Sequence, residues 1–179
     1  MFQKIKFKLN DIDFDRLKGS VAASYGRPPR PKLTYWHLGD REYFESILPS
    51  EMFFGIPPYQ VQIAEIVGSG HLLPHIDHNI SACANYYLDT NGSTTYFYKK
   101  RERAHGFVYP GRTVANIFPL DQVEKVAEFT AEQRDLYLLD VSQIHSVDSP
   151  NPGIRRFISW QWVGVPFETV KSNLIENLK

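Results

Sequence analysis

The chain has 179 residues, of which 42% are hydrophobic and 14% aromatic, which is enough to bury one sizeable core and favours a single domain over 1–179. Its 20 basic and 20 acidic residues cancel, so no overall charge attracts it to nucleic acid or to a membrane surface. The single cysteine, Cys83, excludes an internal disulfide, and residues 1–8 lack the apolar run of a signal peptide. Both features lead us to expect a cytoplasmic protein. No apolar run approaches the roughly 20 residues that cross a bilayer, so we also expect it to be soluble.

The sequence of residues 1–58 predicts an N-terminal region that packs against the main sheet and supports it. Apolar residues within 2–9 predict a short strand with lysines on its exposed face. The proline-rich stretch 26–31 predicts a loop, because proline fixes φ and lacks a backbone donor. Asp40 is placed to cap a helix whose apolar residues recur at helical spacing until Pro49 ends it. A small number of helices should therefore accompany the sheet.

From residue 59 onward, short apolar segments alternate with turns rich in glycine, proline and asparagine. The predicted strands are 59–67, 71–77, 81–88, 94–98, 113–118, 123–129, 136–141, 144–147 and 154–163. The segment 123–129 is ambiguous between helix and strand, and we assign it to a strand. This pattern predicts a mainly β fold, a sandwich or jelly roll with its core over 59–165. An insertion at about 99–134 interrupts the core, and its basic run 99–103 is typical of a solvated hairpin end.

The strongest chemical signal is the sequence His-Leu-Leu-Pro-His-Ile-Asp-His at 71–78. Residues i and i+2 of a strand project from the same face, so His75 and Asp77 would place an imidazole beside a carboxylate. His145, in a later predicted strand, can supply a third ligand. Two histidines and one carboxylate form a facial triad, whose open positions suit Fe(II) that binds a co-substrate and O₂ together. The alternative is that His-x-Asp belongs to an ordinary surface strand.

The last predicted strand contains two adjacent arginines, which alternation places on opposite faces. The more apolar face carries Arg156 together with Ile158, Trp160 and Trp162. This face is predicted to point into the barrel, which leaves Arg155 pointing outward. A buried guanidinium needs an anionic partner, and a dicarboxylate co-substrate would provide one through a planar two-bond contact. The alternative is an internal salt bridge from Arg156 to an acidic residue.

Alternation also divides the predicted strand 81–88. Its polar groups share one face, which carries Ser81, Cys83, Asn85 and Tyr87. Asn85 and Tyr87 are therefore candidates for contact with a ligand. The alternative is an amphipathic strand whose tyrosine hydroxyl bonds to the backbone.

These residues resemble the Fe(II)- and 2-oxoglutarate-dependent dioxygenases, and most closely their prolyl hydroxylase-like branch. In that family a double-stranded β-helix carries a His-x-Asp, a distal histidine and, beyond it, a Lys or Arg that binds the far carboxylate of 2-oxoglutarate. The matching residues follow in the same order and are His75, Asp77, His145 and Arg156. The resemblance covers residues 60–162 approximately.

Two further segments are similar to that branch. Tyr86-Tyr87-Leu88 resembles its Tyr-Tyr-Leu, whose second tyrosine contacts 2-oxoglutarate, and this supports Tyr87. The segment 156–162 resembles its ending from a basic residue to tryptophan. The candidate cofactor-binding residues are therefore Arg156, Tyr87, Asn85 and Trp162.

The resemblance implies a hydroxylase that uses Fe(II), 2-oxoglutarate and O₂ and releases succinate and CO₂. It also allows ascorbate as a further cofactor. Its substrate would be a peptidyl residue such as proline, or else a small molecule. Aromatic side chains are expected near the mouth of the site, namely Tyr96, Tyr98, Trp160 and Trp162, and the insertion could form a lid. The alternatives are a cupin-like metal enzyme that does not use 2-oxoglutarate and a non-catalytic jelly-roll binding module.

Overall fold

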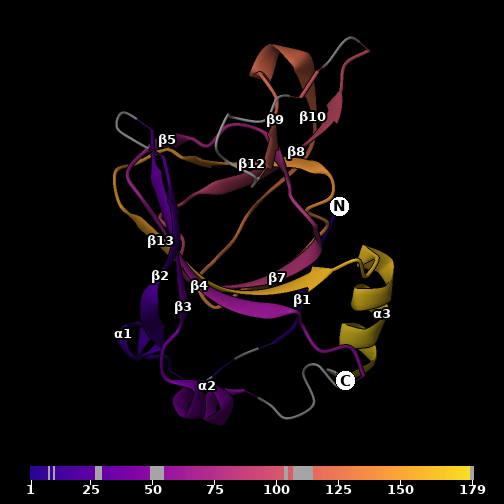
Figure 1. The fold of residues 1–179 in the computed structure, drawn as a ribbon. Coiled ribbons are helices and arrows are strands. Elements are labelled where there is room, and N and C mark those ends of the chain that lie inside the picture. Colours follow the sequence, from indigo (N-terminus) through magenta and orange to yellow (C-terminus); the bar gives the residue numbers. More distant parts are fainter. Residues whose placement is uncertain are drawn as a thin grey trace.

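The computed structural model describes residues 1–7, 9, 11–26, 30–48, 55–102, 105–106 and 115–177. Within these residues the strands form two antiparallel sheets that face each other (Figure 1). The seven-stranded sheet has the order β1 (Phe2–Ile5), β11 (Leu136–Leu139), β7 (Ile80–Asp89), β13 (Ile154–Val163), β4 (Gln60–Val67), β3 (Lys32–Leu38) and β2 (Lys18–Tyr25). The six-stranded sheet has the order β10 (Val123–Thr130), β8 (Thr94–Lys100), β12 (Ile144–Ser149), β6 (His75–Asp77) and β9 (Ala115–Ile117), with β5 (Gly70–His71) also paired to β12.

The connectivity of these strands is that of a jelly roll. After β4 the chain passes back and forth between the two sheets, so that early strands pair with late ones. β4 and β7 both flank β13 in one sheet, while β6 and β8 both flank β12 in the other. This arrangement confirms the predicted mainly β, jelly-roll fold.

Most of the predicted core strands are present within a few residues of their expected bounds, including the ambiguous segment that forms β10. The predicted strand 71–77 is instead two short strands, β5 and β6, separated by residues 72–74. Pro74 lies in this break, where it needs no backbone donor for a strand ladder. Of the predicted strand 113–118, residues 115–117 form β9, and residues 113–114 lie outside the described part of the chain.

The helices were predicted less completely. α2 (Arg41–Ile47) begins as expected after Asp40, whose carboxylate accepts a hydrogen bond from the Tyr43 amide at 2.9 Å. Three short or late elements were not predicted, namely α1 (Phe14–Leu17), η1 (Leu120–Gln122) and α3 (Phe167–Asn177). The pattern of short strands from residue 59 predicts β structure to the end of the chain, and α3 shows that this prediction is wrong. Pro49, the expected stop of α2, lies outside the described residues.

Strands β2 and β3 were also missed, and they extend the seven-stranded sheet beyond β4. β2 has the sequence Lys-Gly-Ser-Val-Ala-Ala-Ser-Tyr, which is mostly small residues without a buried face, because it lies at the sheet edge. Its sequence therefore lacks the alternation that reveals a half-buried strand.

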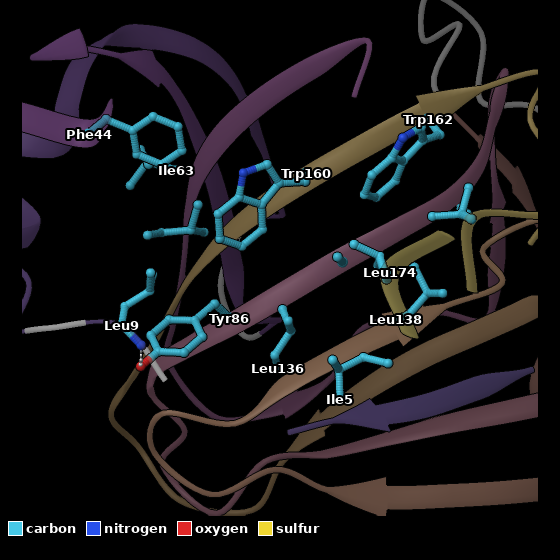
Figure 2. Packing of buried hydrophobic residues seen from close by; sticks show 14 of the residues in the cluster. Ile5, Leu9, Phe44, Ile63, Tyr86, Leu136, Leu138, Trp160, Trp162 and Leu174 are labelled. Carbon is cyan, nitrogen blue, oxygen red and sulfur yellow. Dashed lines mark hydrogen bonds between the residues drawn. The ribbon is translucent and has the colours of Figure 1, made fainter. Parts of the chain in front are cut away.

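The three α-helices lie on the side of the seven-stranded sheet that faces away from the other sheet (Figure 1). We call this side the helix-covered face, and the opposite side of the same sheet the inner face. Figure 2 shows the apolar packing of the helix-covered face, where Trp160 of β13 lies 6.1 Å from Phe44 of α2, measured between ring centroids. Leu174 of α3 belongs to the same buried cluster. β13 is thus buried on both sides. No helix in the described residues is long and apolar enough to cross a membrane.

Candidate metal centre

His75, Asp77 and His145 come together on the side of the six-stranded sheet that faces its partner sheet. His75 of β6 and His145 of β12 are direct cross-strand partners, and their ring centroids are 4.4 Å apart. Asp77 follows His75 at the i+2 position of β6, and its Oδ1 lies 3.5 Å from His75 Nε2 and 4.0 Å from His145 Nε2. One ligand atom from each of the three residues lies within 4.8 Å of the others. The predicted residues therefore form a group that could hold a metal ion.

Backbone carbonyls orient both imidazoles for metal binding. Nδ1 of His75 lies 2.8 Å from the Leu73 carbonyl oxygen, and Nδ1 of His145 lies 3.0 Å from that of Gln143. A proton on each Nδ1 satisfies these carbonyls and leaves the Nε2 lone pair free to bind a metal. Two donor atoms that each lie about 2.1 Å from one ion, in adjacent coordination positions, are about 3 Å from each other. The distances from Asp77 Oδ1 to His75 Nε2 and to His145 Nε2 therefore need to shorten by about 1 Å or less. The three side chains therefore fit a divalent ion with small movements.

Burial, reinforced by the neighbouring His75, lowers the pKa of His145 to about 4. In an unfolded chain the same imidazole has a pKa near ~6.5. His145 is thus neutral in the folded protein at neutral pH, which is the form that binds metals.

This pKa difference predicts how the stability of the metal-free protein depends on pH. Between about pH 6.5 and 4 the unfolded state binds the extra proton at His145, so the free energy of unfolding falls as pH falls, by roughly 3 kcal/mol from this residue. Urea denaturation at pH 7 and pH 4.5 in a chelator measures the loss. The His145→Asn protein cannot take up this proton and should lose clearly less stability; an equal loss would contradict the assignment.

The inner face of the seven-stranded sheet lies opposite this group. As predicted, Asn85 and Tyr87 of β7 share this face, and both are buried. Among the described residues, neither Asn85 Oδ1 nor the Tyr87 hydroxyl has a hydrogen-bond partner. Burial raises the pKa of the Cys83 thiol and of the Tyr35 phenol well above their ordinary values, and the nearby Asp77 carboxylate adds to both shifts. Cys83 and Tyr35 belong to the apolar cluster of the inner face, on which the charge of Asp77 acts.

The two arginines of β13 are exchanged relative to the prediction. Arg155 is on the inner face, and its side chain is only 3% exposed. Its Nη2 donates to Thr95 Oγ1 of the opposite sheet at 3.0 Å. Its guanidinium carbon lies 4.7 Å from the centroid of the Tyr87 ring. Its Nε and Nη1 have no hydrogen-bond partner in the described part of the chain. Arg156 is on the helix-covered face and pairs with Glu65 at 2.9 Å and Asp89 at 3.3 Å. The predicted inward orientation of Arg156 is wrong, and the alternative, an internal salt bridge, is what the structure contains.

The error has a physical reason. The prediction assumed that the more apolar side of β13 faces the barrel interior, but helices cover the outer side and bury Ile158, Trp160 and Trp162 there. The indole Nε1 of Trp162 donates to the Ile56 carbonyl at 3.1 Å on this side. Contrary to the prediction, Trp162 therefore points away from the metal centre. The polar residues of the other side, Arg155, Ser159 and Gln161, were the signal that it lines the interior.

The aromatic residues expected near the mouth of the site also point elsewhere. Tyr98 and Tyr96 lie on the outer side of the six-stranded sheet, where the Tyr98 hydroxyl is 3.0 Å from Ser146 Oγ and the Tyr96 ring is 6.1 Å from that of His71. Trp160 lies on the helix-covered face (Figure 2). These rings therefore do not line the metal centre. Tyr35, which packs against the apolar cluster of the inner face, had no signal in the sequence because its strand was not predicted.

The insertion is described only in part. Its basic run begins in β8, where Lys99 forms an exposed salt bridge with Glu124 of β10 at 3.2 Å. Residues 103–104 and 107–114 of the insertion are outside the described residues. Its described later part forms β9, η1 and β10, of which the two strands belong to the six-stranded sheet.

No protein-family model matches this sequence, and no curated protein matches it in a sequence comparison. Among solved structures, E. coli ycfD is similar with a TM-score of 0.43 and 16% identity, over 83% of this chain and 37% of that one. A mutant of the oxalate decarboxylase OxdC of Bacillus subtilis is similar with a TM-score of 0.38 and 11% identity, over 88% of this chain and 34% of that one. The chain thus spans little more than a third of either protein. Both similarities are weak, and the jelly-roll assignment rests on the strand order of this chain.

Proposed function

We propose that this protein is an Fe(II)- and 2-oxoglutarate-dependent oxygenase that hydroxylates an unactivated C–H bond and releases succinate and CO₂. The supporting observation is that two complementary groups share the interior between the sheets. One is the set of His75, Asp77 and His145, whose ligand atoms lie within 4.8 Å of one another. The other is Arg155, a buried cation with two unpartnered donor atoms.

Arg155 has the properties of a carboxylate-binding residue. A guanidinium that is buried without an anion is unfavourable, and the described residues contain no salt bridge to it. Nε and Nη1 are unpartnered, and Nη2 keeps a second N–H beside the one that it donates to Thr95. One edge of the guanidinium, either Nε with Nη2 or Nη1 with Nη2, is therefore available for a two-bond contact with a carboxylate, while the Thr95 hydroxyl and the Tyr87 ring hold the group in place. The unpartnered Tyr87 hydroxyl offers a further donor nearby. We therefore propose Arg155, in place of Arg156, as the anchor for the far carboxylate of 2-oxoglutarate.

The metal-binding residues divide their tasks. The two imidazoles bind through Nε2, and Asp77 supplies the negative charge that favours a cation at this partly buried position. When bound, Fe(II) would supply the oxidative chemistry, because three protein ligands leave three positions for the co-substrate and O₂. Asn85, with its unpartnered Oδ1 next to Tyr87 on the inner face, would contact the co-substrate between the two groups. The substrate itself is proposed to be a peptide or a small molecule.

The test is to load the purified protein with Fe(II) and measure succinate formed from 2-oxoglutarate in air, with a chelator-treated sample as control. We expect slow succinate formation without added substrate and one bound metal ion per chain. Metal binding without measurable affinity for 2-oxoglutarate would instead indicate a metal enzyme that does not use this co-substrate. Absence of metal binding would indicate a binding module.

A further inference from the structure

Three glutamines form a hydrogen-bonded row on the inner face, which we call the glutamine ladder: Gln60, Gln161 and Gln62. Gln60 Nε2 donates to Gln161 Oε1 at 2.6 Å, and Gln161 Nε2 donates to Gln62 Oε1 at 3.1 Å. Gln161 is 5% exposed and also approaches Ser159 Oγ at 3.4 Å, so its carboxamide is fully engaged. The two outer glutamines of β4 are only partly buried. The row is therefore rigid at its centre and accessible at its ends.

The ladder lies beside the metal centre, on the side away from Arg155. Gln161 of β13 is the direct cross-strand partner of Cys83, which pairs with Leu139 of β11 on its other side. Two residues after Leu139, the Val141 carbonyl accepts a hydrogen bond from the Asp77 amide at 3.2 Å. Arg155 is six positions earlier on the same strand, which corresponds to about 20 Å along it. A co-substrate that reaches from the metal toward Arg155 would occupy one part of the inner face. The ladder occupies the part that remains for the molecule to be oxidised.

The free ends of the ladder differ in hydrogen-bonding character. A carboxamide has two N–H donors and one carbonyl acceptor. Within the described residues, Gln60 Oε1 and Gln62 Nε2 have no protein partner, and Gln60 Nε2 keeps a second N–H. The Gln60 end can therefore accept and donate, and the Gln62 end donates. Rotating all three carboxamides by half a turn would exchange these roles between the two ends. The ladder is thus complementary to a ligand that has both a donor and an acceptor.

The distance between the two ends of the ladder further restricts which ligands can bind both of them. Gln60 and Gln62 are i and i+2 on one strand, which places them about 7 Å apart on the same face. An extended peptide repeats its N–H and C=O groups along one edge with this same spacing. A free amino acid also has a donor and an acceptor, its ammonium and its carboxylate, but both are attached to one carbon atom and cannot reach two ends that are about 7 Å apart.

We propose that the glutamine ladder binds the backbone amides of an extended peptide and positions it for oxidation at the metal centre. This inference rests on the proposed function for the oxidation step, but peptide binding by the ladder can be measured without it. It selects peptides over free amino acids, because the recognised groups are backbone amides.

Binding is tested by nuclear magnetic resonance on protein labelled with nitrogen-15 and loaded with Zn(II) and 2-oxoglutarate, which cannot turn over. The probe is a trialanine peptide that is acetylated and amidated at its ends, compared with free alanine and with an analogue whose central amide is an ester. We expect the peptide to shift the side-chain amide signals of Gln60 and Gln62, and the ester and free alanine to shift them much less. Equal shifts with free alanine, or no shift with the peptide, would overturn the proposal.

A pair of matched variants provides the control. Gln62→Leu removes one end of the ladder at a partly buried position and should weaken peptide binding about tenfold, the expected effect of one lost hydrogen bond. Gln3→Leu makes the same change at an exposed site on β1 and should leave binding unchanged. Equal weakening in both variants would overturn the assignment to the ladder. Peptide binding without succinate formation in the Fe(II) assay would sustain this inference while refuting the oxygenase function.

Discussion

Replacing His145 with alanine is expected to abolish tight binding of Fe(II), or of Ni(II) or Zn(II) as surrogates, and with it all succinate formation. The change removes the most buried of the three ligands and leaves only His75 and Asp77, which belong to one short strand. Two adjacent ligands cannot form the facial set that the proposed chemistry needs. Elemental analysis after gel filtration should give one metal ion per chain in the unchanged protein and almost none in the variant. Full occupancy in His145→Ala would rule the assignment out.

His71 provides the matched control for this change. It is a partly buried histidine on the outer side of the six-stranded sheet, where its Nε2 is 3.1 Å from Ser146 Oγ. The His71→Ala protein should therefore keep its metal, although it loses a hydrogen bond beside the strand that carries His145. If both variants lost metal equally, the cause would be general loss of structure rather than loss of a ligand. Circular dichroism of the metal-free proteins distinguishes the two cases.

Replacing Arg155 with alanine is expected to weaken 2-oxoglutarate binding by about two to four orders of magnitude. The reason is that a bidentate ion pair at a largely buried position is lost, which costs roughly 3–5 kcal/mol. Arg155 is 3% exposed, so water cannot replace the missing contacts at the co-substrate carboxylate. Calorimetric titration of 2-oxoglutarate into the Zn(II)-loaded variant measures the affinity directly, without interference from turnover.

The neighbouring Arg156 is the control that the chain itself offers. Its side chain is 32% exposed and is neutralised by Glu65 and Asp89 on the helix-covered face. Arg156→Ala should therefore change the affinity for 2-oxoglutarate only a few-fold, while removing surface ion pairs that contribute about 1 kcal/mol or less to stability. A larger loss of affinity in Arg156→Ala than in Arg155→Ala would refute the assignment of the two faces.

The residues of the metal centre could be predicted from the sequence because their arrangement is local. His75 and Asp77 are two positions apart, and in any strand that spacing places them on one side. His145 lies in an apolar segment short enough to be a strand, and cross-strand pairing with His75 completes the group. Alternation in β7 likewise placed Asn85 and Tyr87 together on a buried face. The mainly β fold followed from the same short-range pattern and its turns.

Alternation along a strand is enough to predict which of its residues share a side, but what covers each side depends on the packing of distant segments. Alternation separates Arg155 from Arg156, yet the packing of α2 and α3 makes the outer side of β13 the more apolar one. The glutamine ladder likewise joins residues from strands about 100 positions apart, which only the pairing of β4 with β13 brings together. Hydrophobic burial depends on contacts between distant segments, so the direction in which Arg155 points could not be read from its own strand.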